Sequence, residues 1–147
     1  MNGKRLNIGL LIDDFDHYFS SQACKGAELA AKALDANLFI FPGHYIGKPD
    51  SSYSDKEFEY QYNTLFHLPS ERNVDIIYVV LGTICSRADI EMQKKFISSF
   101  PDVPVVCLFS NFEGLASVTV YNRSGLESAL EQYQVHGKHL IMLAIIY

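Results

Sequence analysis

The sequence is poor in features that define whole classes of protein. It has only three cysteines, Cys24, Cys85 and Cys107, whose odd number and wide spacing argue against a disulfide framework and favour reduced cytosolic thiols. It has no run of Lys or Arg, and 12 basic against 17 acidic residues give a formal net charge of -5, so nucleic acid is not an expected partner. No stretch is long and apolar enough to cross a membrane, and the opening MNGKRLNIGLLIDDFD lacks the pattern of a signal peptide. We therefore expect a cytoplasmic protein without a membrane partner.

What the chain does have is apolar material for a core. Of its 147 residues, 48% are hydrophobic, which suits one globular domain of ordinary size. Short, nearly continuous runs of Ile, Val, Leu and Phe indicate strands buried on both faces, as in a parallel sheet covered by helices. The expected strands are Asn7–Ile12, Asn37–Phe41, Asp75–Leu81, Val103–Leu108 and His139–Ile146, with a weaker one at Ser117–Tyr121. A buried helix is the alternative for each run.

Helical patterns lie between these runs. They cover Ser20–Leu34, about Ser54–Phe66, about Ser86–Phe100 and about Ser124–His136. Ser54 with Glu57, and Ser86 with Asp89, have the spacing of helix-opening caps, and Gly137 suits the end of the last helix. The alternation predicts an α/β, three-layer, Rossmann-like (flavodoxin-like) fold: a mostly parallel sheet with helices on both faces and right-handed crossovers. The carboxyl ends of the strands are then the functional edge.

An acidic cluster, Asp13, Asp14 and Asp16, follows the first strand. Such a cluster holds Mg²⁺ in phospho-receiver domains, but a receiver also needs an aspartate where the third strand ends, and 79–82 reads Val-Val-Leu-Gly. The simpler interpretation is that these carboxylates favour the following helix N-terminus.

Other catalytic and cofactor patterns are incomplete. GHYIGKP has the wrong glycine spacing for a phosphate loop, and the turn IDDFDHYF has no glycine for a dinucleotide. Gly137 separates His136 from His139, which disfavours a metal site, and Cys85 has no evident partner to activate it as a nucleophile. We therefore expect no enzyme activity, no catalytic residues, no metal and no cofactor.

Aromatic residues follow the first two expected strands. Phe15, Tyr18 and Phe19 come after the first, and Tyr45 and Tyr53 lie in the loop after the second. Aromatic faces beside carboxylates suit a small polar molecule, which stacks on a ring and donates hydrogen bonds to an acid. Covers over the end of the sheet are the alternative.

The segment NIGLLIDDFDHYFSSQACKGAELAAKAL resembles the opening of the effector domain of lactose-repressor (LacI/GalR) regulators, which is similar to periplasmic sugar-binding proteins. Gly9, Asp14 and Gly26 fall on the strand glycine, the turn aspartate and the helix glycine of that family. VDIIYVVLG, FPDVPVVCLFS and SVTVYNRSGLESALEQYQVHGKHLIMLAI resemble its later strands and helix. The family's proline turn is replaced by Asp16-His17-Tyr18, and its Asp-Asn pair by Tyr121-Asn122.

The resemblance implies a periplasmic-binding-protein-like (type 1) half-domain. Residues 1–123 would form its N-terminal lobe, and residues 124–147 the opening helix and strand of an incomplete second lobe. The implied function is ligand sensing within a bacterial transcriptional regulator or signal-transduction protein, in which a sugar-like or nucleoside-like molecule shifts the conformation. The expected ligand-binding residues are Asp14, Asp16, Tyr18, Phe19, Tyr45, Thr83, Ser110, Asn122 and Arg123.

Two other functions remain open. An interaction module would use the lobe for pairing, and an uncovered apolar face would be its sign. A homodimer is expected in either case, because a half-domain must complete itself by pairing unless it is a fragment. A flavodoxin-like cofactor binder is the third hypothesis, and bound flavin would reveal it.

Overall fold

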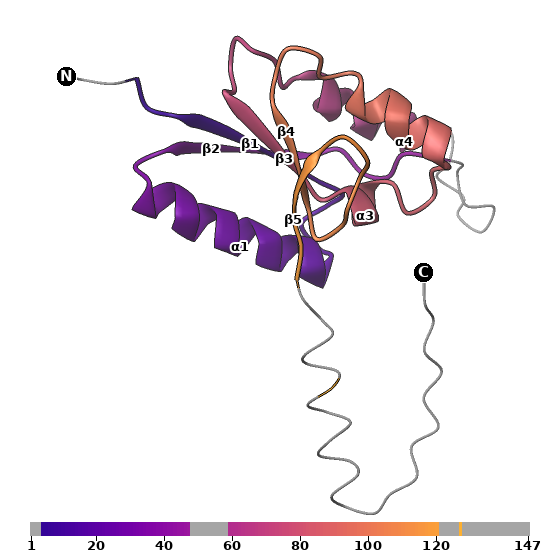
Figure 1. Cartoon of the computed structure of the whole chain (residues 1–147), viewed down its shortest axis with the longest axis horizontal. Helices are drawn as coiled ribbons and strands as arrows, with labels where there is room; N and C mark the ends of the chain where they lie inside the picture. Colours follow the sequence, from indigo (N-terminus) through magenta and orange to yellow (C-terminus); the bar gives the residue numbers. More distant parts are fainter. Residues whose placement is uncertain (1–3, 48–58, 121–126, 128–147) are drawn as a thin grey trace, which may run out of the picture.

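The computed structural model describes residues 4–47, 59–120 and 127. Five strands form one sheet in which all neighbours are parallel, in the order β2-β1-β3-β4-β5 (Figure 1). The strands are β1 (Asn7–Ile12), β2 (Asn37–Pro42), β3 (Ile76–Val79), β4 (Val105–Leu108) and β5 (Ala116–Val118). The predicted α/β class with a parallel, Rossmann-like sheet is confirmed.

Helices lie on both faces of the sheet (Figure 1). The longest, α1 (Tyr18–Ala33), packs on one face, which we call the α1 face. The opposite face carries α4 (Ile90–Ile97) and the 3-10 helix η1 (Asn63–His67), which continues α2 (Glu59–Tyr62). A single turn, α3 (Leu81–Ile84), directly follows β3.

The larger core lies on the α4 face. Leu11, Ile77, Val79 and Cys107 point to this side from the inner strands, where Phe66 of η1 and Phe96 of α4 cover them. The rings of Phe66 and Phe96 meet edge to face at 5.2 Å. Alternate residues of the same strands point to the α1 face, as the pleat requires. That core is smaller, with Leu10, Ile12, Ala23 and Val80 as its buried members.

Several expected boundaries were wrong. The expected strand Val103–Leu108 begins only at Val105, and the expected strand Ser117–Tyr121 is observed over Ala116–Val118. The run Asp75–Leu81 is a strand only over Ile76–Val79, and Leu81 opens α3, so its apolar end reflects a buried turn of helix. The expected helix Ser86–Phe100 spans only Ile90–Ile97. Asp89 is its N-cap and accepts a hydrogen bond from the Met92 N–H at 2.9 Å, the role expected of Ser86. The helix Ser124–His136, apart from Glu127, and the strand His139–Ile146 lie outside the described residues, as do Ser54 and Glu57.

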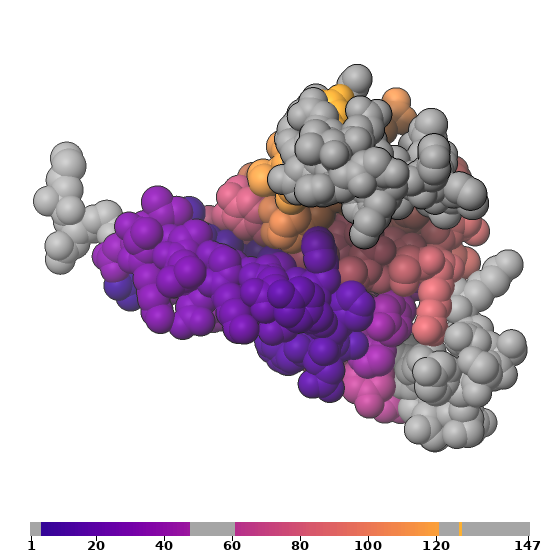
Figure 2. All heavy atoms as spheres, turned by 90° about the horizontal axis from the view of Figure 1, so that it is seen from below, coloured from indigo at the N-terminus to yellow at the C-terminus, as the bar shows by residue number. Residues whose placement is uncertain are grey.

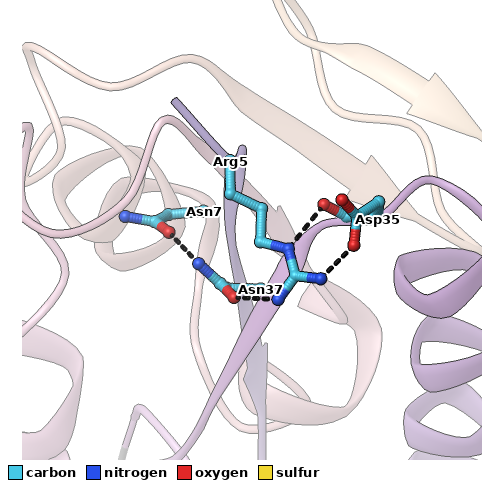
Figure 3. A network of polar contacts seen from close by, with 4 residues as sticks. All are labelled: Arg5, Asn7, Asp35 and Asn37. Atoms are coloured by element: carbon cyan, nitrogen blue, oxygen red, sulfur yellow. Dashed lines mark hydrogen bonds and ion pairs between the residues drawn. The ribbon is translucent and has the colours of Figure 1, made fainter. Parts of the chain in front are cut away.

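A polar network ties the chain together at the amino ends of β1 and β2 (Figure 3). Arg5 forms an ion pair with the Asp35 carboxylate, and its Nε donates to the Asp35 carbonyl oxygen at 3.0 Å. Asn37 donates to the Asn7 side-chain oxygen at 2.8 Å, between residues that are partners in the β1–β2 register. These bonds therefore hold β1 and β2 together at the amino edge of the sheet, opposite the carboxyl ends of the strands.

Asp75 makes a similar link between β1 and β3, and it should make stability depend on acid. Its carboxylate accepts from the Asn7 N–H at 2.8 Å and from Lys4 Nζ at 3.1 Å, and these bonds lower the pKa of Asp75. A carboxyl group whose pKa is lower in the folded than in the unfolded state stabilises the fold at pH values above its unfolded pKa. This stabilisation is lost as the pH falls through the folded-state pKa. We expect Asp75→Asn to lower the melting temperature at pH 7, as measured by circular dichroism. We also expect the melting temperature of this variant to fall less between pH 7 and pH 3 than that of the natural chain. Asp102→Asn, at an exposed residue, is the control. If the melting temperature of Asp75→Asn fell as much between pH 7 and pH 3 as that of the natural chain, Asp75 would not be a source of the acid dependence.

Cys85 should resist alkylation in the folded protein. Burial raises its pKa to about 12, with a further contribution from nearby Cys107. At pH 8 only about one thiol in ten thousand is then ionised, and the thiolate is the nucleophile. We expect iodoacetamide to label Cys85 only after unfolding in urea, as followed by peptide mass spectrometry. Labelling of Cys85 at the same rate with and without urea would show that this thiol is not buried in the folded protein.

Candidate functional site

The carboxyl edge of the sheet begins with a tight turn between β1 and α1. The Asp14 side chain accepts a hydrogen bond from the His17 N–H at 2.7 Å, which closes the turn and positions the start of α1. Asp16 is exposed, and Tyr18, the first residue of α1, is 78% exposed. Of the residues expected here, Asp14 thus has a turn-forming role, whereas Asp16 and Tyr18 face solvent.

Asp13, rather than its two neighbours, is the buried acid of this edge. It is 1% exposed at the end of β1, and its Oδ1 accepts a hydrogen bond from the hydroxyl of Ser20, which is also buried. Its other oxygen, Oδ2, has no hydrogen-bond partner among the described residues. The pKa of the Cys24 thiol is raised, mainly by burial of the thiol and in addition by the negative charge of Asp13. Burial was the missing signal, since the sequence shows three acids without indicating which one is enclosed.

A second part of the edge follows β2. His44 has φ of 64°, and its ring stacks on Tyr62 with centroids 4.6 Å apart. Tyr45 lies edge-on to His44, and the Arg87 guanidinium lies over the Tyr45 ring at 4.7 Å. His44 Nδ1 is buried without a described partner. The expected residue Tyr45 is thus part of a cluster whose other members, His44, Tyr62 and Arg87, sequence reasoning missed because they come from three different segments.

Hydrogen bonds connect the backbone of this cluster to neighbouring segments. Asn63 Nδ2 donates to the carbonyl oxygens of Gly43 at 2.6 Å and Tyr45 at 3.0 Å, and the Ile46 N–H donates to the Ile84 carbonyl at 2.8 Å. Gly47 forms a parallel bridge with Arg87. The loop after β2 is therefore joined to η1 and to the segment after β3.

The remaining expected residues lie after β3 and β4. The Thr83 hydroxyl donates to the Val80 carbonyl at 3.2 Å within its own turn, and Ser110 Oγ lies 3.2 Å from Cys107 Sγ. Phe19 packs edge to face on Phe109, with ring centroids 4.7 Å apart. Phe109 has φ of 64°, so the residues that leave β2 and β4 both adopt left-handed backbone, which is uncommon outside glycine. Asn122 and Arg123 lie outside the described residues.

An apolar groove begins at Phe19 and Phe109 and runs along the α1 face. This groove has a volume of about 540 Å³ and lies between α1 and the strands β1, β3, β4 and β5, from which Leu10, Tyr78, Leu108 and Val118 form part of its floor. Its lining is almost entirely apolar, so it does not suit a polar molecule. Among the described residues, no side chain fills this groove, and an uncovered apolar face was the sign expected of an interaction module.

Metal-binding clusters and membrane-spanning helices are both absent from residues 4–47 and 59–120. Within this part of the chain, no three His, Cys, Asp or Glu side chains gather closely enough to hold a metal ion. No helix there has both the length and the apolar character needed to span a membrane.

The fold and this edge define an α/β protein of the Rossmann-like type with a polar carboxyl edge and an apolar groove beside it. Comparison with known proteins adds no closer relation: no family model, curated protein or solved structure matches the chain.

Gly47, in the loop after β2, should be sensitive to substitution. It has φ of 128°, and an added Cβ would overlap the carbonyl oxygen of Arg87. We expect Gly47→Ala to lower the free energy of unfolding by about 1–3 kcal/mol in a urea titration. Gly82→Ala, where an added Cβ has no heavy atom within 4 Å, is the matched control. Equal effects of the two substitutions would show that the bridge to Arg87 does not constrain the loop.

Proposed function

We propose that the chain is a ligand-sensing lobe of the periplasmic-binding-protein-like type, belonging to a bacterial transcriptional regulator or signal-transduction protein. The ligand is a small polar molecule, sugar-like or nucleoside-like, and it binds at the carboxyl edge of the sheet. The parallel order β2-β1-β3-β4-β5 supports this proposal, because ligands of open α/β sheets bind outside the carboxyl ends of the strands. The resemblance of residues 7–34 to the effector domains described above supports the family. The free thiols of the described cysteines agree with a reducing, cytoplasmic setting.

The observation that carries the proposal is the oxygen Oδ2 of Asp13. A buried acceptor without a partner costs about 1–3 kcal/mol, and more when it is charged. Such a group is retained where a donor completes it, and a ligand hydroxyl or amino group is such a donor. The bond from Ser20 holds the carboxylate in one orientation, so little conformational freedom is lost on binding.

The exposed ring of Tyr18 at the start of α1 offers a stacking face, and the exposed Asp16 offers a second acceptor. A ligand held there contacts the β1–α1 turn and would favour one of two arrangements of the lobe relative to an attached partner module. Sensing then follows from the difference in affinity between the two arrangements. The proposed role is binding, and no residue is assigned a catalytic step.

Replacing Asp13 by Asn should separate binding from folding. Asn keeps an acceptor for Ser20 but puts an amide N–H₂ where Oδ2 accepts. We expect monosaccharides or nucleosides to raise the melting temperature of the natural chain. For the compound that gives the largest rise, Asp13→Asn should weaken the affinity tenfold or more in isothermal titration calorimetry.

Two controls accompany this measurement. Asp102→Asn makes the same chemical change at an exposed residue before β4 and should leave the affinity unchanged. Tyr18→Ala should weaken binding about threefold to tenfold through lost stacking, whereas Leu29→Ala, at another exposed residue of α1, should not. If no compound of either class raises the melting temperature, or if Asp13→Asn binds as tightly as the natural chain, the proposal is wrong.

A further inference from the structure

The groove on the α1 face exposes apolar surface that a folded protein normally covers. Leu34 and Val118, which both line it, are more than half exposed. The groove follows α1 from Phe19 to Leu34, a distance of about 22 Å at the rise of an α-helix. Small residues of α1 line its middle, so another helix can approach α1 closely there. Figure 2 looks onto this side of the molecule, with α1 in indigo and violet and the residues around β5 in orange.

The remainder of the chain starts at one end of this groove. Val118 is the last residue of β5, and its carbonyl oxygen accepts a hydrogen bond from the Phe109 N–H at 2.7 Å. Phe109 in turn packs against Phe19, at the start of the groove. A segment that follows a parallel strand leaves from the carboxyl edge and returns over one face of the sheet. A helix that follows β5 on the α1 face would therefore run along the groove, from the Phe19 end to the Leu34 end.

The segment 124–136 has the pattern of a helix with one apolar stripe. Its large or apolar residues recur at spacings of three and four: Leu126, Ala129, Leu130 and Tyr133. Glu127 and Glu131 fall on the other side, and Glu127, the residue of this segment that the structure describes, is helical and exposed. Such a helix is about 20 Å long, which matches the groove. A helix this short is marginal by itself and needs an apolar surface to pack on.

The two faces of the sheet beside β5 differ in what covers them. On the α4 face, Phe112 and Leu115 of the loop between β4 and β5 pack against the larger core. On the α1 face, Leu108 and Val118 form part of the open groove in the described part of the chain. A helix on the α1 face covers this surface. A connection from there to a parallel strand beyond β5 would be left-handed, which is rare, so the apolar run 139–146 would remain available to the second lobe.

We infer that residues 124–136 form a helix that lies in the groove, parallel to α1, as an internal cover of the first lobe. Leu130 is about 9 Å along this helix from residue 124, and Gly26 is about 10 Å along α1 from Phe19, so the two residues meet near the middle. The resemblance to effector domains implies that 124–147 opens the second lobe, and this inference moves 124–136 to the first. It does not depend on ligand binding at the carboxyl edge.

Gly26→Leu has opposite expected effects for an open and a filled groove. A Cβ added at Gly26 has no heavy atom of the described residues within 4 Å, and leucine is a better helix former than glycine. An open groove therefore predicts a melting temperature that is unchanged or higher. A helix in the groove leaves no room for the leucine side chain, so we expect the melting temperature of the full chain to fall by about 5 °C or more. Gly82→Leu, at an exposed glycine that also has no such neighbour, is the matched control and should not lower it.

A second pair of variants tests which segment fills the groove. Leu130→Ala removes apolar contact and should also lower the melting temperature, whereas Glu131→Ala, on the polar side of the same pattern, should leave it nearly unchanged. Leu130→Ala makes room for the side chain added by Gly26→Leu, so the drop for the double variant should be smaller than the sum of the two single drops.

Hydrogen exchange followed by mass spectrometry reports on the segment directly. We expect the amides of 124–136 to be protected in the natural chain and to exchange about tenfold faster, or more, in Gly26→Leu. The amides of β1 and β3 should keep their rates in this variant, because the cores on which these strands depend are unchanged. Gly82→Leu should leave the exchange of 124–136 as it is in the natural chain.

Three results would overturn the inference. If Gly26→Leu keeps or raises the melting temperature, the groove is open, and a simultaneous loss in Leu130→Ala would place the helix on the α4 face. If the two single drops add fully in the double variant, another segment fills the groove. If sedimentation equilibrium gives the mass of a dimer and the melting temperature rises with protein concentration, a second copy covers the groove instead.

Discussion

The handedness of the crossovers is the constraint on which the rest of this structure depends. The chain passes from β1 to β2 with α1 on one face, and then turns back, so that every later step adds a strand in the opposite direction. Right-handed connections must then lie on the other face. There η1 and α4 bridge the strands, and the loop between β4 and β5 packs Phe112 and Leu115 against the same core. Among the described elements, α1 alone covers its face, and the groove follows from that.

The same reversal organises the carboxyl edge. The strand order reverses at β1, so the segments that follow β1, β2 and β3 begin at the carboxyl ends of three adjacent strands and cross to different faces of the sheet. The uncommon conformations of His44 and Phe109 occur where two strands end, and the buried acid of Asp13 lies between them in the strand order. At the amino edge, by contrast, Arg5 and Asp75 form hydrogen bonds and ion pairs that fix the register of the strands. The buried acid of Asp13 and the register-fixing bonds thus lie at opposite ends of one sheet.

The sequence predicted the sheet well because buried strands leave a strong local signal. The limits of β1 were predicted correctly, those of β2 to within one residue, and α1 begins two residues before its expected start. The errors at Leu81 and Ser86 have a common cause. An apolar run and a capping residue report burial and local hydrogen bonding, and neither says whether the chain continues straight or turns. Leu81 is buried in a turn of helix, and Asp89 competes successfully with Ser86 for the cap.

By itself, the sequence determined the α/β class, the parallel pairing implied by buried strands, and the edge at which polar residues collect. These depend on side-chain pattern and short-range geometry. Only the tertiary structure decided that Asp13 is enclosed while Asp16 is exposed, that His44 meets Tyr62, and that an apolar groove lies between α1 and the strands β1, β3, β4 and β5 in the described part of the chain. Such facts depend on contacts between residues distant in the chain, and on which face each connection crosses, and neither is encoded in the order of residues within any one segment.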